Sequence, residues 1–318
     1  MVGGSDIRNV AVIGAGLMGH GIALDFALSG YNVRLHSRTE NSLKRGFAML
    51  QSSVQRLIKI GVLKQDESKE VLEKVTLSSV LSDSLADVDL VVESVYENVE
   101  LKRRVFQELG RIAPRAAILA SNTSGIMPSK FALDSERPDK VLVTHYANPP
   151  FLIPTVELVR TQYTSDETIS KVCDFYAKLG KRPIVAQKEV PGFILNRLQL
   201  ALFREALWLV ENGVATPQDV DFGIKSSIGR RWSVAGVFEV FELAGLDLAS
   251  EIGRHIFPHL STEKEVPRVL LEKVASGDVG AKSGKGFYEW APESVEELQQ
   301  RVARALVTIE SWQDFHSL

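Results

Sequence analysis

The sequence predicts an α/β protein in which an N-terminal doubly wound sheet is followed by an all-helical C-terminal domain. A short apolar segment runs directly into the motif G-x-G-x-x-G at residues 14–19 and then into an apolar, helix-forming stretch. Strand-like and helix-like segments alternate as far as residue 186, and only helix-like segments follow. The expected domains are therefore residues 1–186 and residues 187–318.

The first expected strand covers residues 9–13 and leads into the turn Gly14-Ala15-Gly16-Leu17-Met18-Gly19. In this context Gly14 permits a tight turn, Gly16 lets the backbone approach a pyrophosphate, and Gly19 lets helix and strand pack closely. The first N–H groups of the helix then hold the phosphates. We expect a Rossmann-type dinucleotide site whose contacts are Gly14, Gly16, Leu17, Met18 and Gly19.

The remaining elements follow in order along the chain. Further strands are expected at residues 33–35, 75–77, 89–93, 117–120, 141–143, 156–159 and 183–185. Helices are expected at residues 100–112 and 166–179, and a polar, helix-favouring stretch at about residues 40–73 is predicted as a helical insertion. In the second domain, helices are expected near residues 193–212, 217–227, 234–243, 246–256, 264–276 and 292–313.

Composition agrees with a soluble two-domain protein: 318 residues, 45% hydrophobic and 24% charged. A net charge of −3 gives no reason to expect nucleic acid or an acidic membrane surface. The single cysteine, Cys173, excludes an intrachain disulfide and fits a reducing compartment. No signal-peptide pattern and no long apolar run occurs, so we expect a cytoplasmic protein without a membrane span.

Two ionisable residues, His145 and Glu157, lie at the ends of neighbouring strand-like segments. Adjacent strands would bring the imidazole and the carboxylate together, and a His oriented by a carboxylate is a general base for a hydroxyl proton. The alternative is a core His bonded to a local carbonyl, with an unrelated Glu. The residues alone leave both interpretations open.

Ser124 and Asn196 are further polar candidates. Ser124 follows the strand expected at residues 117–120, at the carboxyl edge where open α/β sheets bind ligands. Asn196 lies one turn into an apolar helix, where its amide needs a polar partner such as a substrate oxygen or the His. The alternatives are an ordinary turn Ser and an Asn bonded to nearby backbone.

Five motifs occur in a fixed order along nearly the whole chain. They are Val91-Val92-Glu93-Ser94-Val95-Tyr96-Glu97-Asn98, Ser121-Asn122-Thr123-Ser124, His145-x-x-Asn148-Pro149, Lys188-Glu189-Val190-Pro191-Gly192-Phe193-Ile194-Leu195-Asn196-Arg197 and Gly284-x-Gly286-Phe287-Tyr288. With these motifs the chain resembles the 3-hydroxyacyl-CoA dehydrogenases. Within them it is most similar to the lambda-crystallin branch, which includes L-gulonate 3-dehydrogenase.

The resemblance assigns roles by position. It makes His145 the catalytic base, Glu157 its partner, and Ser124 and Asn196 the polar groups around the reacting oxygen. It places Glu97 and Lys102 at the nicotinamide end and ribose of the cofactor, and assigns Asn122 to the cofactor and Asn148 to the substrate.

The chain departs from the family at the end of the second strand, which reads His36-Ser37-Arg38-Thr39. Ser37 stands where the family has an acidic residue on the adenosine ribose. Without that carboxylate a 2′-phosphate is not repelled, and Arg38 with the hydroxyls of Ser37 and Thr39 attracts it. The alternative is that Ser37 or Thr39 caps the next helix and Arg38 is solvated. NAD and NADP both stay open, with NADP favoured.

A second departure concerns the substrate. The segment 227–239 differs from acyl-CoA members of the family and contains Arg231 and Trp232. An Arg-Trp pair facing the nicotinamide binds a carboxylate and shields it from water, which favours a small hydroxy acid. The alternative is an L-3-hydroxyacyl-CoA, because Ser53 falls where acyl-CoA members contact CoA.

We therefore predict an NAD(P)-dependent oxidoreductase that interconverts an L-3-hydroxy acid and its 3-oxo form. A recruited crystallin-type structural protein and a dinucleotide-sensing module are the alternatives, although neither needs the four catalytic residues. An apolar stripe at residues 295, 298, 302, 306 and 309 predicts a homodimer through the C-terminal domain, unless the stripe packs on its own subunit. No metal is expected, because Pro258 separates His255 from His259 and a third ligand is missing.

Overall fold

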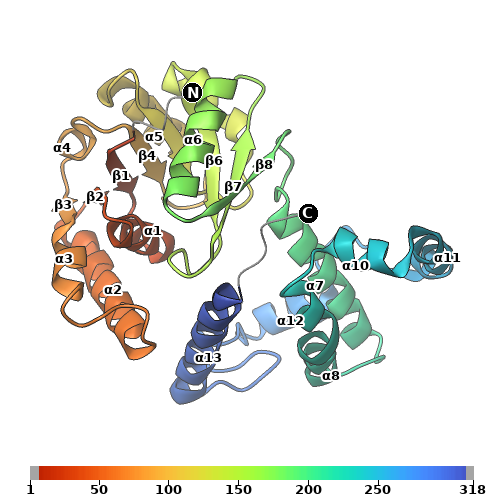
Figure 1. The fold of residues 1–318 in the computed structure, drawn as a ribbon. Helices are drawn as coiled ribbons and strands as arrows, with labels where there is room; N and C mark the ends of the chain where they lie inside the picture. The colour runs from red at the N-terminus through yellow and green to blue at the C-terminus, as the bar shows by residue number, and fades with distance from the viewer. Residues whose placement is uncertain (1–6, 313–318) are drawn as a thin grey trace. The chain divides into compact units, whose positions relative to one another are not determined.

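The computed structural model describes residues 7–312 and is shown in Figure 1. Its residues form two compact units, one extending to Arg197 and the other starting at Leu198. The strand pattern alone places the boundary near residue 187. The difference arises because Phe193, which follows the last strand, is fully buried with Val143, Val159 and Ala186 of the sheet.

The first unit is built on an eight-stranded sheet with the order β3-β2-β1-β4-β5-β6-β7-β8. The strands are β1 (Asn9–Ile13), β2 (Asn32–His36), β3 (Val75–Ser78), β4 (Leu90–Glu93), β5 (Ile118–Ser121), β6 (Val141–Tyr146), β7 (Thr155–Arg160) and β8 (Arg182–Ala186). All neighbouring strands are parallel except β6 and β7, which are antiparallel. The predicted doubly wound sheet is confirmed.

Helices connect the strands of this unit: α1 (Leu17–Leu28), α2 (Glu40–Lys59), α3 (Ser68–Glu73), α4 (Leu81–Leu85), α5 (Val99–Ile112) and α6 (Asp166–Lys178). The side chains of Thr39, Asn98 and Ser165 cap α2, α5 and α6 by accepting a backbone N–H of the first turn. The predicted helical insertion is divided into α2 and α3, because the chain turns at Gly61 with a φ of +77°.

The core of this unit lies on both faces of the sheet. Alternate residues of β1 point to opposite faces, so Val10 and Val12 join one apolar cluster while Ala11 and Ile13 join the other. Burial on both faces explains why the strands read as continuous apolar runs. The same burial on both faces holds the carboxyl ends of β1, β4, β5 and β6 together as one rigid edge of the sheet.

The second unit is helical, as predicted. It contains most of α7 (Leu195–Glu211), and then α8 (Pro217–Gly223), α9 (Gly229–Trp232), α10 (Val237–Ala244), α11 (Leu246–Ile256), α12 (Arg268–Ala275) and α13 (Pro292–Ser311). The helix expected at residues 217–227 is shorter, because residues 224–228 form a π-helical turn between α8 and α9. No helix within residues 7–312 is long and apolar enough to cross a membrane.

Candidate active site

The glycine turn between β1 and α1 has the geometry that a dinucleotide needs. Gly14 has a φ of +115°, and a Cβ there would lie 2.3 Å from the Ser94 carbonyl oxygen. A Cβ on Gly19 would lie 1.7 Å from the Gly14 oxygen, so neither position admits a side chain. A Cβ on Gly16 would meet nothing within 4 Å. Gly16 therefore borders open space, where a pyrophosphate can approach the backbone.

The start of α1 is free to bind an anion. Gly16 is its N-cap and provides no side-chain hydrogen bond, and the next residue, Leu17, is 62% exposed. The first N–H groups of this 12-residue helix, which include those of Leu17 and Met18, have no acceptor earlier in the helix. Together with the helix dipole they favour a phosphate, so the residues present fit a dinucleotide.

The end of β2 shows how the three candidate ribose ligands are placed. Thr39 accepts a hydrogen bond from the Ser42 N–H at 3.2 Å and caps α2, as the alternative interpretation holds. Ser37 is half-buried and Arg38 is exposed. Arg38 has no hydrogen-bond or ion-pair partner in the described part of the chain, so its guanidinium is available to a ligand.

A buried carboxylate lies below the ends of β4 and β5. Glu93, the last residue of β4, is fully buried and accepts from Lys102 Nζ at 2.8 and 2.9 Å. Ser121 donates to the same carboxylate at 2.6 Å, as does the Val95 N–H. Lys102 is itself 0% exposed. It is therefore enclosed beneath the sheet edge and held by Glu93, and its role toward the cofactor stays a prediction.

Glu97 links this buried pair to the loop after β5. It lies 3.5 Å from Lys102 Nζ and accepts hydrogen bonds from the Thr123 hydroxyl and from the N–H groups of Ser124 at 2.9 Å and Gly125 at 3.2 Å. Burial acts to raise the pKa of Glu97, but Thr123, Lys102 and the two N–H groups together lower it. Glu97 is thus an ionised anchor for the segment that carries Ser124.

Ser124 is held by its backbone on two sides. Its N–H donates to Glu97, and its carbonyl oxygen accepts from Asn196 Nδ2 at 2.7 Å. The Ser124 hydroxyl has no partner among residues 7–312 and remains available for a substrate. Asn196 thus bonds to a backbone carbonyl, as the alternative interpretation holds, but to one on the loop that carries Ser124. Asn122 is buried, and its Oδ1 accepts from the Tyr146 N–H at 2.9 Å.

His145 and Glu157 form the centre of the site. The antiparallel pairing of β6 and β7 sets the two residues directly opposite each other. His145 Nδ1 lies 3.0 Å from Glu157 Oε2, and the residues are 5% and 0% exposed. Because a carboxylate only accepts, Nδ1 carries the proton and Nε2 is left with a free lone pair. Nε2 has no hydrogen-bond partner within the described residues, and this is the state of a general base.

The other oxygen of Glu157 is fixed by the start of α7. Oε1 accepts from the Ile194 N–H at 2.5 Å and from the Leu195 N–H at 3.4 Å. The preceding residue, Phe193, has a φ of +52°, an uncommon value for a bulky residue. Its buried ring packs against the His145 ring with the centroids 5.9 Å apart. This strained turn therefore aims two backbone donors at the carboxylate that orients His145.

The remaining predicted substrate residues differ in burial. Ser53 is 5% exposed and bonded to His20 Nε2 at 3.3 Å, so it lies in the packing of α2 on α1. That burial disfavours the predicted contact of Ser53 with CoA, which stays a prediction. Asn148 is exposed on the loop between β6 and β7. Arg231 and Trp232, the last residues of α9, are exposed in the second unit.

Sequence reasoning missed three functional contributors: Glu93, Thr123 and Phe193. A signal existed for Glu93, because an acidic residue that ends an apolar strand must find a partner once it is buried. Nothing local marks Phe193, whose positive φ appears only in the folded chain.

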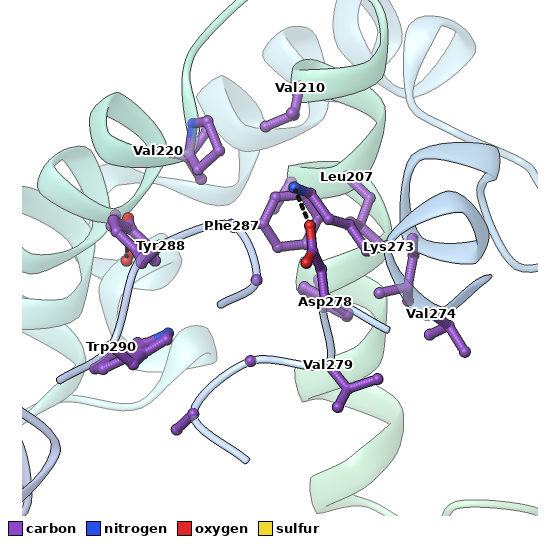
Figure 2. Close-up of a pocket in the computed structure, with 18 residues that line it drawn as sticks. Leu207, Val210, Val220, Lys273, Val274, Asp278, Val279, Phe287, Tyr288 and Trp290 are labelled. Atoms are coloured by element: carbon purple, nitrogen blue, oxygen red, sulfur yellow. Dashed lines mark hydrogen bonds and ion pairs between the residues drawn. The ribbon is translucent and has the colours of Figure 1, made fainter. Parts of the chain in front are cut away.

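A separate cavity of about 460 Å³ lies within the second unit (Figure 2). It is lined mainly by apolar side chains of α7, α8 and α12 and by the segment 278–290, and Lys273 pairs with Asp278 at 3.6 Å on its wall. None of the predicted site residues lines it. No group of three or more potential metal ligands occurs in the described ranges.

A dinucleotide-type sheet edge that presents a carboxylate-oriented His defines a nicotinamide-dependent dehydrogenase. Comparison with known families specifies which one. Residues 9–190 match the 3-hydroxyacyl-CoA dehydrogenase NAD binding domain, and residues 192–290 match the C-terminal domain of the same family. The chain therefore belongs to the 3-hydroxyacyl-CoA dehydrogenase family.

Individual relatives cover almost the whole chain. The chain is 33% identical over 303 residues to 5-formyl-3-hydroxy-2-methylpyridine 4-carboxylate 5-dehydrogenase of Mesorhizobium japonicum, covering 95% of this chain and 97% of the relative. It is 33% identical to an L-carnitine dehydrogenase of Oceanobacillus iheyensis (95% and 90% covered) and 38% identical to a probable 3-hydroxybutyryl-CoA dehydrogenase of Deinococcus radiodurans (88% and 99%).

A solved structure supports the same assignment. The crystal structure of the 5-dehydrogenase for the pyridine 4-carboxylic acid, described as an NAD⁺ dependent dismutase, has a TM-score of 0.87. It is 32% identical, with 96% of this chain and 97% of that chain covered.

Proposed function

We propose that the protein interconverts an L-3-hydroxy acid and its 3-oxo form by hydride transfer with a nicotinamide cofactor. The observation that carries the proposal is the buried His145–Glu157 pair at 3.0 Å, formed by facing residues of β6 and β7 at the edge of a dinucleotide-type sheet. A structural protein or a dinucleotide sensor has no need for a buried base with one ring nitrogen free.

The proton has a defined path in this arrangement. Nε2 of His145 accepts the hydroxyl proton of the substrate, and Glu157 stabilises the resulting imidazolium through Nδ1. The N–H groups of Ile194 and Leu195 keep Glu157 from rotating during this transfer. The Ser124 hydroxyl is free to donate to the substrate oxygen, since Glu97 and Asn196 hold the backbone of Ser124 on either side.

The cofactor supplies the hydride acceptor. Gly14, Gly16 and Gly19 form the turn for its pyrophosphate, together with the first N–H groups of α1. We further propose that NADP is accepted alongside NAD, because Ser37 carries no charge and the guanidinium of Arg38 is unpaired among the described residues. The expected consequence of Arg38→Ala is a weaker NADP complex and an unchanged NAD complex, which titration of both reduced cofactors measures.

A small carboxylate is the favoured substrate class. Ser53, the expected CoA contact, is buried against His20. Arg231 is exposed in α9 and its guanidinium has no partner within residues 7–312, so it can receive a carboxylate by a charge-assisted contact. Two of the relatives are named for a pyridine carboxylate and for carnitine. The alternative substrate remains an L-3-hydroxyacyl-CoA, because the Deinococcus radiodurans relative is named a probable 3-hydroxybutyryl-CoA dehydrogenase.

We also propose a homodimer formed through the helical unit. Phe238 and Leu243 of α10 are 84% and 86% exposed, and Phe257 after α11 is 71% exposed. Apolar surface of this extent on a folded domain is typical of an interface. In α13, Val302 of the predicted stripe is 45% exposed, so the stripe is only partly covered by its own chain.

The test is a turnover assay that follows reduced nicotinamide, with acetoacetate and acetoacetyl-CoA as probes and NADH and NADPH as cofactors. Reduction of either probe that is abolished by His145→Gln supports the reaction class. Efficient reduction of acetoacetyl-CoA with inert acetoacetate selects the alternative substrate. Absence of turnover with every pair would overturn the proposal for this class of short 3-oxo compounds.

A further inference from the structure

A buried ion pair joins Asp25 of α1 to Lys181, the residue before β8. Lys181 Nζ lies 2.7 Å from Asp25 Oδ1, and the two side chains are only 7% and 6% exposed. Neither residue belongs to the glycine turn or to the His145–Glu157 pair. Burying two charges is costly even when they are paired, so stability alone is a poor reason for their presence.

Lys181 also holds the loop that connects β6 to β7. Its Nζ donates to the carbonyl oxygens of Pro150 at 2.7 Å and Ile153 at 3.1 Å. Together with Asp25, these acceptors use all three N–H bonds of the ammonium group. The N–H of Arg182 donates to Pro154 at 2.8 Å. The loop, residues 147–154, is therefore attached to the start of β8 through its own carbonyls.

Helix α1 touches the same loop. A Cβ on Gly21 would lie 2.9 Å from Pro150 Cδ, which shows how closely helix and loop approach. Asp25 follows one turn later on the same face of the helix. Gly21 and Asp25 thus make two consecutive attachments between the helix that starts at the glycine turn and the loop held by Lys181.

This loop is the direct link between the two catalytic strands. It begins just after His145 at the end of β6, ends just before β7 with Glu157, and carries Asn148. Lys181 Nζ also lies 5.9 Å from the ring centre of Tyr146.

Burial raises the pKa of Asp25 to about 6, and the Lys181 charge limits that rise. The carboxylate therefore depends on Lys181 to stay ionised.

We propose that Asp25 and Lys181 are positioning residues that fasten the β6–β7 loop to helix α1. In this way they hold His145 and Asn148 in a fixed relation to the glycine turn. The inference rests on the proposed function for its kinetic consequence, but its structural consequence can be measured without any substrate.

The test replaces both charges at once, in Asp25→Leu/Lys181→Met. Apolar residues of similar volume often replace a buried ion pair without loss of stability, so the double variant is expected to fold. Because a small displacement of reacting groups is costly, kcat should fall about 10- to 100-fold. KM for the probe and the Kd for NADH should change less than about threefold, since the turn and the open sheet edge are untouched.

Hydrogen exchange gives the readout that is independent of turnover. The N–H groups of Leu152 and Ile153 both donate to Pro149 and should exchange faster in the double variant. Arg137→Met is the matched control, because Arg137 is a buried cation that also binds backbone carbonyls, those of Leu109, Gly110 and Ala113. It should lower stability while leaving kcat and exchange in the loop unchanged.

A folded double variant with the kcat of the wild type, or with unchanged exchange at Leu152 and Ile153, overturns the inference. If the double variant does not fold, Asp25→Ala decides instead, because it removes the acceptor on α1 and should raise exchange in the loop. Wild-type protein that reduces neither probe refutes the proposed function, while the exchange result still decides whether the loop is fastened.

Discussion

The first unit buries large apolar side chains on both faces of its sheet, whereas the second unit leaves many of them in solvent. Phe26, Phe106 and Phe175 of the first unit are all 0% exposed. Between Leu198 and Trp312, the buried apolar side chains are those of Leu207 and Ala303, at 4% and 3% exposed. The second unit therefore exposes apolar surface of the kind that the proposed homodimer would cover.

The same difference separates two kinds of site. The proposed catalytic groups in the first unit are held by neighbours inside one core, as Glu157 is by the start of α7. Arg231 and Trp232 lie on an exposed helix end of the second unit. Chemistry is thus assigned to the unit with the fixed geometry, while assembly and substrate selection are proposed for the unit with exposed side chains.

The largest expected effect tests whether chemistry belongs to the first unit alone. His145→Gln should lower kcat by about 10²- to 10⁴-fold, because it removes the proton acceptor. The Kd for NADH and the molecular mass in solution should stay near wild type. Glu157→Gln should cost less, since it weakens orientation and leaves the acceptor. Steady-state kinetics and cofactor titration measure both, and a His145→Gln enzyme with most of its rate would contradict the mechanism.

The next effect concerns assembly through the second unit. Phe238→Glu/Leu243→Glu places charges where large apolar side chains are exposed, and should weaken a dimer by about 100-fold or more. Sedimentation at micromolar concentration measures the change. Leu133→Glu is the matched control, because Leu133 is also exposed, at 58%, but lies in the first unit. A monomeric wild type, or equal effects of both changes, would contradict assembly through the second unit.

A smaller effect tests whether the second unit selects the substrate. Arg231→Met should raise KM for a short 3-hydroxy acid about 10- to 100-fold, because a charge-assisted contact contributes about 1.5–3 kcal/mol and 1.4 kcal/mol is one decade. The KM for any CoA thioester that is turned over should change little. Arg230→Met is the neighbouring control. Equal KM values for wild type and Arg231→Met would make Arg231 a surface residue.

The smallest effect is a pH dependence of stability confined to the first unit. Burial lowers the pKa of His36 below its ordinary 6.5. A His with a depressed folded-state pKa stabilises fully above the unfolded value and loses that contribution as pH falls below it. The loss is at most about 1.4 kcal/mol per pH unit for one proton.

The measurement is the difference in urea midpoint between wild type and His36→Gln above and below pH 6.5. That difference isolates His36 from Asp25, whose raised pKa acts in the opposite direction as pH falls. His255→Gln is the control, because His255 is exposed in the second unit. A midpoint difference that does not depend on pH would refute the assignment to His36.

The fold was predictable because its signals are local and repeated. The signals are apolar strand runs, helix periodicity and the glycine turn at residues 14–19. Each is a property of a short segment, and such segments are buried in the same way in any sheet of this kind. The His145–Glu157 pair was predictable for a related reason. Both residues end adjacent strands, and pairing of those strands sets them opposite each other.

The tertiary structure decided which polar residues are enclosed and which are free. Lys102 and Ser53 had positions that suggested contacts with ligands, but Lys102 is buried against Glu93 at the end of β4 and Ser53 is buried against His20 of α1. Conversely, the hydrogen bonds from the N–H groups of Ile194 and Leu195 to the Glu157 carboxylate depend on the positive φ of Phe193. Sequence by itself determined the architecture and the cofactor turn, because these follow from short-range periodicity. It also placed His145 and Glu157 on adjacent strands, while their catalytic role was implied by the resemblance. Burial, backbone strain and the Asp25–Lys181 attachment are decided only when distant segments pack together, because each depends on partners that no local pattern specifies.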